Sequence, residues 1–448
     1  MRMSILALAA CLLVFLSGCA KEPPPPPEPI TVKVLFNGSS SQFHSLYGSR
    51  LAEQYPHYMV EVVDLQQTGY RHTTDSLKKA IQETAPDIIQ LEQAEYRQLA
   101  SEGLIVNLDA RIQESAYDLS KLYPPIVELL RKEGGGSIFG LSPYFFGTAL
   151  FYNKTLFEKY GVPLPRDGMT WAEVLELASR FPADGELTGI YHGPVRRSSF
   201  IFSALGEAVR YYDSTGRKLL VDTEQWRAIW SRSVAAYRSG ALRAEASQAF
   251  VKTMTDEQEL SRIADANWFA AGKSAMKVAR LDMADTIEQL GGKDGPSFEW
   301  DVVTKPVGIH EPDVAQNMEL WNILSISSSS SQKEAAWDIV RFINGEAMAK
   351  QLASVSGGGY LPTMMGMLPE RPGVNLEAFY KLRKASQFDT TRRIVPVTFV
   401  RAFYDLADQE IDAVLAGDKT EEQALRDLQV SGQKLLDAEW LKQGQKSP

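Results

Sequence analysis

The chain has 448 residues, a formal net charge of −9 at pH 7 and two cysteines, and 44% of its residues are hydrophobic. This length is ample for two domains of ordinary size. The acidic balance and the absence of any lysine- or arginine-rich run argue against nucleic acid as a partner. Beyond the first residues no stretch approaches the length of a membrane span, so we expect no transmembrane helix in the body of the chain.

The amino terminus has the pattern of a secretory signal peptide, with Arg2 ahead of a short apolar run from Ile5 to Phe15. The run is shorter than the roughly 20 residues that span a bilayer. The sequence Leu-Ser-Gly-Cys that ends at Cys19 resembles the lipobox of bacterial lipoproteins. That resemblance implies removal of residues 1–18 and lipidation of the Cys19 thiol, with palmitate among the attached chains. The alternative is an ordinary signal peptide with a chance cysteine.

Residues 19–29 predict a lipid-anchored, proline-rich stalk. Five consecutive prolines, Pro23–Pro27, favour polyproline II, which is semi-rigid and rises about 3.1 Å per residue. The stalk would hold the globular part roughly 30 Å from the anchor; the alternative is a ligand for a proline-recognising domain. Because Cys11 would leave with the signal peptide, we expect no disulfide, no cysteine-ligated metal and no thiol nucleophile in the mature chain.

After the stalk, strands alternate with helices. Segments rich in β-branched and apolar residues predict strands at 30–36, 59–65 and 86–91, and helical periodicity follows at 44–55, 74–83 and 94–102. This alternation predicts a parallel sheet with crossover helices, in which ligands bind at the carboxyl ends of the strands. Those ends lie at 37–42, 66–70 and 91–93.

A second unit and a helical tail are predicted after the glycine-rich turn at 134–137. Strands are expected at 149–152, 276–279, 301–306 and 322–326. Capping-box pairs, Thr170 with Glu173 and Asp222 with Gln225, predict the starts of two helices that reach about 180 and 237. A further helix is expected at 257–271, and residues 332–441 are expected to be mostly amphipathic helix.

The common enzyme motifs are missing. Gly272-Lys273-Ser274 lacks the earlier glycine of a phosphate-binding loop, because that position is Asn267. The five histidines have no metal-ligand spacing, and there is no Gly-x-Ser-x-Gly sequence. Carboxylates are plentiful, but no spacing singles out an acid/base pair. We therefore expect no catalysis, no metal and no cofactor.

Short motifs occur in a characteristic order along most of the chain. They are Pro86–Ile89, Leu99–Leu104, Leu108-Asp109, Gly140–Tyr144, Leu150–Lys154, Phe157–Pro163, Thr170–Glu173, Phe269, Gly272-Lys273, Ala275-Met276, 334–343 with Glu346, and Tyr360–Thr363. In this order they resemble extracellular solute-binding protein family 1, a family of lipid-anchored receptors of ABC importers, mainly for carbohydrates, to which the maltose-binding protein is related.

The resemblance implies an α/β fold of two lobes, the periplasmic-binding-protein fold, with a hinge, a ligand cleft between the lobes and a helical C-terminal part. The implied N-lobe comprises 30–146 and 306–347, and the implied C-lobe comprises 147–305 and 348–448. Closure around a ligand would be a hinge motion. A sugar suits such a cleft, because its hydroxyls need polar partners and its C–H faces stack on aromatic rings.

Site residues follow from the same resemblance. Those expected from the N-lobe and the crossover are Asn37, Ser41, Gln42, Glu92, Gln93, Tyr144 and Phe145. In the C-lobe the family usually has a glycine and a tryptophan where this chain has Arg280 and Asp282, which would pair with each other or grip a polar ligand. Trp321 and Tyr404 are expected as aromatic walls. The alternative is hinge packing for Tyr144 and Phe145, a place in the core for Trp321 and Tyr404, and a solvated loop acid for Glu92.

The implied function is that of a lipid-anchored, monomeric binding protein of an ABC importer, on the outer face of the cytoplasmic membrane. It would capture a polar organic solute, with a sugar favoured, and deliver it to the permease. Two alternatives stay open: a ligand-sensing subunit for a membrane histidine kinase, and an extracellular glycan-degrading enzyme.

Overall fold

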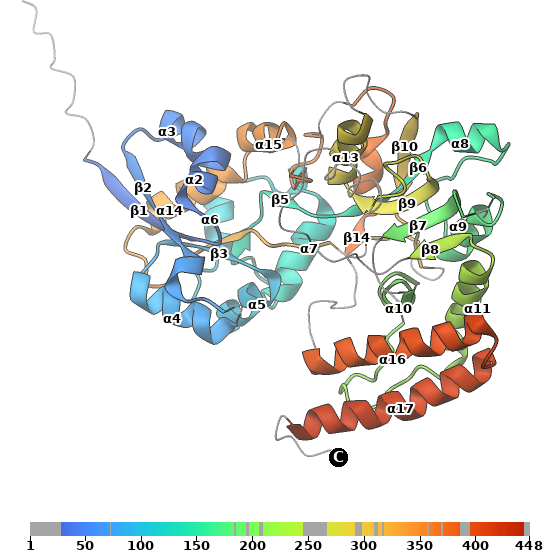
Figure 1. The fold of residues 1–448 in the computed structure, drawn as a ribbon. Helices are drawn as coiled ribbons and strands as arrows, with labels where there is room; N and C mark the ends of the chain where they lie inside the picture. The colour runs from blue at the N-terminus through green and yellow to red at the C-terminus, as the bar shows by residue number, and fades with distance from the viewer. Residues whose placement is uncertain are drawn as a thin grey trace, which may run out of the picture.

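The computed structural model describes residues 28–71, 73–182, 185–193, 197–205, 209–244, 267–291, 298–308, 312–315, 318–355, 358–368, 371–385 and 395–442. The signal peptide, Cys19 and the proline run lie outside these residues, as does most of the helix expected at 257–271. The described residues form two α/β lobes side by side, with a pair of long C-terminal helices against the second lobe (Figure 1). No helix among them is long and apolar enough to cross a bilayer.

The first lobe contains a five-stranded sheet in the order β2-β1-β3-β12-β4. Its strands are β1 (Ile30–Phe36), β2 (Tyr58–Asp64), β3 (Ile88–Leu91), β4 (Gly140–Leu141) and β12 (Ile323–Ile326). β1 is parallel to both β2 and β3, whereas β12 returns from far along the chain and lies antiparallel to β3, with Ile323 opposite Leu91. The carboxyl end of β3 therefore lies beside the point at which the chain re-enters this lobe.

Alternate side chains of these strands enter two separate cores. Leu35 and Ile89 face one core, whereas Val34 and Ile88 face the other, because successive strand residues point to opposite faces. The first core is covered by α4 (Thr74–Thr84), α5 (Gln93–Ser101) and α7 (Pro124–Glu133). The second is covered by α2 (Ser40–Phe43), a π-helical turn (His44–Gly48), α3 (Ser49–Gln54), α6 (Asp109–Glu114), α14 (Lys333–Ile343) and α15 (Glu346–Ala353).

Helix α15 corrects one expected boundary. The C-lobe was expected to resume at residue 348, but Met348 and Leu352 are buried in the second core of the first lobe, where they pack in one cluster with Trp337 of α14. The apolar face of α15 therefore packs on the first lobe, and the chain leaves this lobe only after α15.

The second lobe has its own five-stranded sheet, in the order β10-β6-β9-β7-β8. Its strands are β6 (Thr148–Asn153), β7 (Thr188–Gly193), β8 (Leu242–Ala244), β9 (Ser274–Arg280) and β10 (Trp300–Thr304). β7, β8 and β9 are mutually parallel, and β9 is antiparallel to β6, with Arg280 opposite Thr148. The helices of this lobe are α8 (Lys154–Lys159), α9 (Trp171–Ala178), α10 (Arg197–Ser199), α11 (Glu224–Arg238) and α13 (Asp282–Gly291).

Helix starts in this lobe follow capping chemistry. Thr170 and Glu173 form the expected capping box at α9. At α11 the expected cap is wrong by one residue, because Thr223 accepts the hydrogen bond from the Trp226 N–H. Asp222 instead accepts from the Arg227 guanidinium.

Three extended passes of the chain connect the lobes. β5 (Tyr144–Phe145) leads from β4 into β6, and β13 (Leu361–Pro362) pairs antiparallel with it. On the next residue, Phe146 exchanges two backbone hydrogen bonds with Glu319, of 3.1 and 3.0 Å, from the pass that leads to β12. The connection is therefore a small hydrogen-bonded ladder rather than three independent linkers.

The chain ends in an antiparallel helix pair, α16 (Val397–Ala416) and α17 (Glu421–Lys442). Their core includes Trp226 and Trp230 of α11 with Phe403 and Leu428 of the pair, so the pair belongs to the second lobe. Between α15 and α16 the structure departs from the expectation that residues 332–441 are mostly amphipathic helix. The described residues there form β13, a 3-10 turn (Leu376–Tyr380) and β14 (Lys384–Ala385), which pairs with β11 (Val314–Ala315).

Candidate ligand-binding site

The strand ends of both lobes converge on the connecting ladder. In the first lobe, β3 ends at Leu91 beside the start of β12. In the second lobe, β9 ends at Arg280 opposite Thr148, two residues after Phe146 of the ladder. Ligands of α/β sheets bind at the carboxyl ends of parallel strands. The region around the ladder is therefore where this fold can hold a ligand with both lobes.

Four aromatic side chains gather there, and we call them the aromatic group: Tyr144, Phe146, Trp321 and Tyr360. The ring centroids of Tyr144 and Tyr360 lie 4.4 Å apart, and those of Phe146 and Trp321 lie 5.1 Å apart. Tyr144 and Phe146 are buried, but Trp321 is 48% exposed. The indole of Trp321 is therefore exposed to solvent and packs against the buried ring of Phe146.

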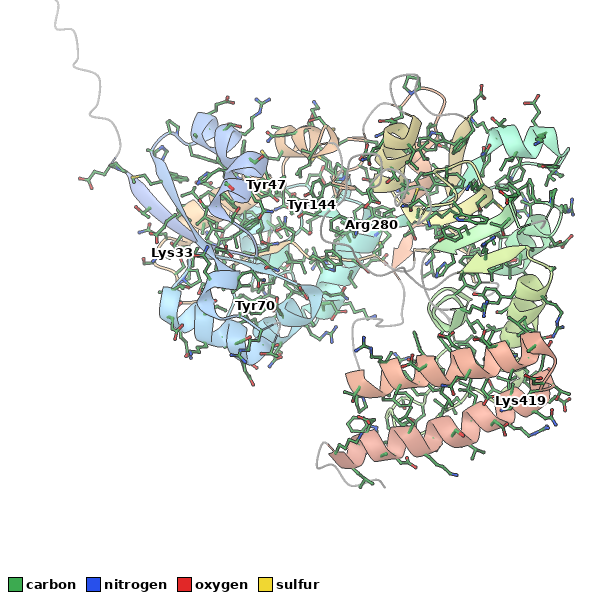
Figure 2. The ribbon with its side chains drawn as sticks, viewed as in Figure 1. Lys33, Tyr47, Tyr70, Tyr144, Arg280 and Lys419 are labelled. Carbon is green, nitrogen blue, oxygen red and sulfur yellow. The ribbon has the colours of Figure 1, made fainter. Side chains whose placement is uncertain are left out.

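Arg280 joins the second lobe to this group. Its guanidinium carbon lies 3.9 Å from the ring centroid of Phe146 and 5.9 Å from that of Trp321, and its Nε lies 3.6 Å from a carboxylate oxygen of Asp282. In Figure 2, Arg280 and Tyr144 lie where the two lobes meet. A Cβ on Gly359, which has a φ of 59°, would lie 3.3 Å from Arg280 Nη2. This glycine therefore lets the chain segment that leads into β13 lie close to the Arg280–Asp282 ion pair.

One carboxyl and one amide add polar character. Burial raises the pKa of Glu319, and the nearby charge of Arg280 offsets only part of this rise. The Glu319 carboxyl is therefore easier to protonate than an exposed glutamate. The Asn322 amide donates to the Tyr47 hydroxyl at 2.8 Å, and burial raises the pKa of Tyr47 well above its usual value. The Asn322 carbonyl oxygen is buried without a hydrogen-bond partner in the described part of the chain.

At the end of β1 the expected polar residues are partly committed to local structure. Asn37 donates its backbone N–H to the Gln90 side chain at 3.0 Å and accepts from Gln66 at 2.6 Å. Gln42 closes the capping box of α2, whereas Ser41 is exposed and its hydroxyl lies 3.0 Å from that of Ser39. Asn37 and Ser41 therefore keep polar atoms at the strand end, and Gln42 serves the helix.

At the end of β3, Glu92 is the N-cap residue of α5 and its side chain is partly exposed. Gln93 is buried, and its amide donates to Glu133 at 3.1 Å, so this side chain braces α5 against α7. Gln90 was not among the expected site residues. It accepts from the Asn37 N–H and donates to the Trp321 backbone carbonyl at 3.0 Å, and it therefore links the end of β1 to the backbone of Trp321.

Two expected aromatic residues lie elsewhere. Phe145 points to the opposite side of β5 from Tyr144, where its ring stacks on Tyr123 at 5.2 Å in a buried core. Tyr404 stacks on Phe202 at 5.6 Å within the core of the helix pair. The structure brings neither ring to the aromatic group. Phe146 and Tyr360 stand there instead, and strand alternation from Tyr144 would have identified Phe146.

Comparison with known proteins identifies a family and related structures. The family model described as "Bacterial extracellular solute-binding protein" matches residues 49–378. The sugar-binding protein MalE from the phytopathogen Xanthomonas citri matches at 16% identity, over 93% of this chain and 100% of that chain, with a TM-score of 0.64. An ABC substrate-binding protein from Listeria monocytogenes in complex with cycloalternan matches at 20% identity, over 94% and 100%, with a TM-score of 0.56.

A family 1 extracellular solute-binding protein from Alicyclobacillus acidocaldarius matches at 15% identity, over 92% of this chain and 99% of that chain, with a TM-score of 0.65. At these identities the structural likeness concerns the fold. It confirms the expected two-lobe α/β architecture.

Proposed function

Since the chain belongs to the bacterial extracellular solute-binding protein family, we propose that it is the lipid-anchored binding protein of a sugar ABC importer. It binds a sugar or oligosaccharide between its lobes and delivers it to a membrane permease, without catalysing a reaction. Related structures named for sugar binding or solved with a saccharide support this choice. The protein works as a monomer.

The observation that carries the proposal is the exposed indole of Trp321 on the aromatic group, at the place where the strand ends of both lobes converge. An indole face stacks on the C–H face of a pyranose, and polar groups nearby bond its hydroxyls. Asp282, Glu92, Asn37 and Ser41 supply such groups from the two sides of the ladder. A stacked ring flanked by carboxylates and amides is suited to a polyhydroxyl ligand.

The test is ligand binding by the purified chain. A panel of neutral and acidic mono- and oligosaccharides is screened by thermal shift and confirmed by isothermal titration calorimetry. A ligand present at a hundred times its Kd stabilises the folded state by about 2.7 kcal/mol, which is readily detected as a rise in Tm. If no member of the panel raises the Tm, the proposed function is wrong.

Two variants localise the binding. Trp321→Ala should weaken sugar binding at least tenfold, because it removes the exposed ring of the aromatic group. Tyr160→Ala is the matched control, because Tyr160 is also a partly exposed aromatic residue but lies at the end of α8, where its ring contacts Phe181 and Lys159. Equal affinities of the Trp321 variant and the wild type would exclude this site.

The anchor has a separate test. Cells that express the full chain are labelled with a palmitate analogue, and the membrane fraction is compared with that of Cys19→Ser. We expect label and membrane association in the wild type, and neither in the variant. Label in both proteins, or in neither, would show that Cys19 is not the lipidated residue.

A further inference from the structure

The second lobe contains a buried ammonium group that has no anionic partner among the described residues. Lys277 lies in β9, three residues before Arg280, and is only 7% exposed. Its Nζ lies 4.8 Å from the ring centroid of Tyr191 in the neighbouring parallel strand β7. Throughout the described ranges, no carboxylate or other acceptor lies within hydrogen-bond or ion-pair distance of this Nζ.

The ring does not compensate for the burial of this charge. A cation–π contact is a weak interaction, whereas an unpaired buried ammonium loses considerably more hydration free energy than such a contact returns. Burial accordingly lowers the pKa of Lys277 to about 8. A strongly perturbed group that lacks a structural partner marks a candidate functional position.

The surroundings of Lys277 are positive rather than acidic. Burial lowers the pKa of His192, in β7, to about 4, and the charges of Lys277 and Lys305 lower it further. Lys305 directly follows β10 and is also buried. With this pKa His192 is neutral near pH 7, so the positive charge around it comes from Lys277 and Lys305, and two lysines on one lobe favour an anion.

Gly193 leaves the ammonium open to a ligand. It is the last residue of β7 and has a φ of 129°. A Cβ at this position would lie 3.6 Å from Lys277 Nζ and, chain neighbours aside, within 4 Å of no other heavy atom of the described residues. Because Gly193 ends a strand parallel to β9, this open side faces the edge of the sheet at which the strand ends converge.

We propose that the bound solute carries an anionic group, a carboxylate or a phosphate, which forms an ion pair with Lys277 Nζ at the carboxyl ends of β7 and β9. The cargo is then an acidic saccharide or a phosphorylated sugar rather than a neutral one. This inference rests on the proposed function, because it concerns the ligand of the same site. An ion pair with Lys277 gives the buried ammonium a partner that the described residues do not supply.

The test compares neutral sugars with their charged counterparts by isothermal titration calorimetry on the full chain. The carboxylate arm pairs galactose with galacturonate, and galactotriose with trigalacturonate. The phosphate arm pairs glucose with glucose 6-phosphate. In at least one pair, the charged member should bind at least tenfold more tightly than the neutral member, which corresponds to about 1.4 kcal/mol. The arm that shows this preference identifies the anionic group.

Three variants assign the preference to Lys277. Lys277→Met should weaken binding of the preferred anion at least tenfold, and Lys277→Arg, which keeps the charge, should restore part of the affinity. Lys273→Met is the matched control. It removes the same charge from an exposed lysine just before β9, and it should change the affinity less than twofold. The melting temperature without ligand verifies that each variant is folded.

The outcomes separate this inference from the proposed function. If neutral sugars bind and charged ones do not bind more tightly, the inference is wrong and the proposed function stands. The inference also fails if the preference for the anion persists in folded Lys277→Met. If neither neutral nor charged sugars bind, both are overturned.

Discussion

Replacing Lys277 by methionine should stabilise the protein in the absence of ligand. Methionine has a similar length and adapts to irregular apolar surroundings, and the change removes a buried ammonium whose pKa is lowered from 10.5 to about 8. Each pKa unit corresponds to about 1.36 kcal/mol, so the charged form destabilises the native state by about 3 kcal/mol. The gain at pH 7 should approach that value.

The pH dependence has a definite sign. Below pH 8 the ammonium is protonated in both the native and the unfolded states, and the full destabilisation is present. Between about pH 8 and 10.5 the unfolded chain binds a proton that the native state has released, so wild-type stability rises with pH through this window. The stability difference between Lys277→Met and the wild type should therefore shrink steadily as the pH rises from 8 towards 10.5.

Urea denaturation of both proteins at pH 7.0 and pH 9.5, followed by far-ultraviolet circular dichroism, measures this difference. Lys273→Met is the control, because its lysine is exposed and its substitution should shift the unfolding free energy by less than about 0.5 kcal/mol at either pH. A Lys277→Met protein that is no more stable than the wild type at pH 7, or a gap that is the same at both pH values, would refute the reasoning.

Three further predictions concern packing and binding. Gly432→Ala should lower the unfolding free energy by about 1–3 kcal/mol in urea titrations, despite its better helix propensity, because its Cβ would lie 2.7 Å from Leu219 and 3.0 Å from Phe403 in the buried core of the helix pair. Phe145→Ala should cost about 3–5 kcal/mol in the same assay, and a loss below 1 kcal/mol would contradict its placement in the core. Asp282→Ala or Glu92→Ala should weaken solute binding at least tenfold in calorimetry while the melt without ligand stays nearly unchanged; wild-type affinity in both would remove them from the site.

The elements of the first lobe could be predicted closely because their signals are local. The strand expected at 30–36 is β1, and the helix expected at 74–83 is α4 to within one residue. The pairing of β12 with β3 joins segments more than two hundred residues apart, and no local pattern contains that information. Only the family resemblance placed this return strand. The described residues between 358 and 385 belong to a segment that was expected to be mostly helical. Contacts with both lobes stabilise their extended conformation, and local periodicity does not contain that information.

The family resemblance led to several residues that lie around the ladder, whereas residues placed there by strand alternation or distant contacts were not expected. Tyr144, Arg280, Asp282 and Trp321 do lie around the ladder. Tyr360, directly before β13, joins the aromatic group through its contact with Tyr144. This contact joins distant parts of the chain, so no local pattern predicts it. Lys277 had a weak local signal, because it is the one charge in the interior of an otherwise small and apolar strand.

The ladder between the lobes limits the kinds of movement that the protein can make. Its passes are bonded laterally, through the β5–β13 pair and the reciprocal bonds of Phe146 and Glu319, so no pass can slide along its neighbour without breaking backbone hydrogen bonds. Bending all passes together keeps every one of these bonds. Lobe rotation is therefore a flexing of one narrow strip of sheet with a fixed register. Amide hydrogens of Phe146 and Glu319 should exchange equally slowly with and without solute, even while the lobes on either side change their separation.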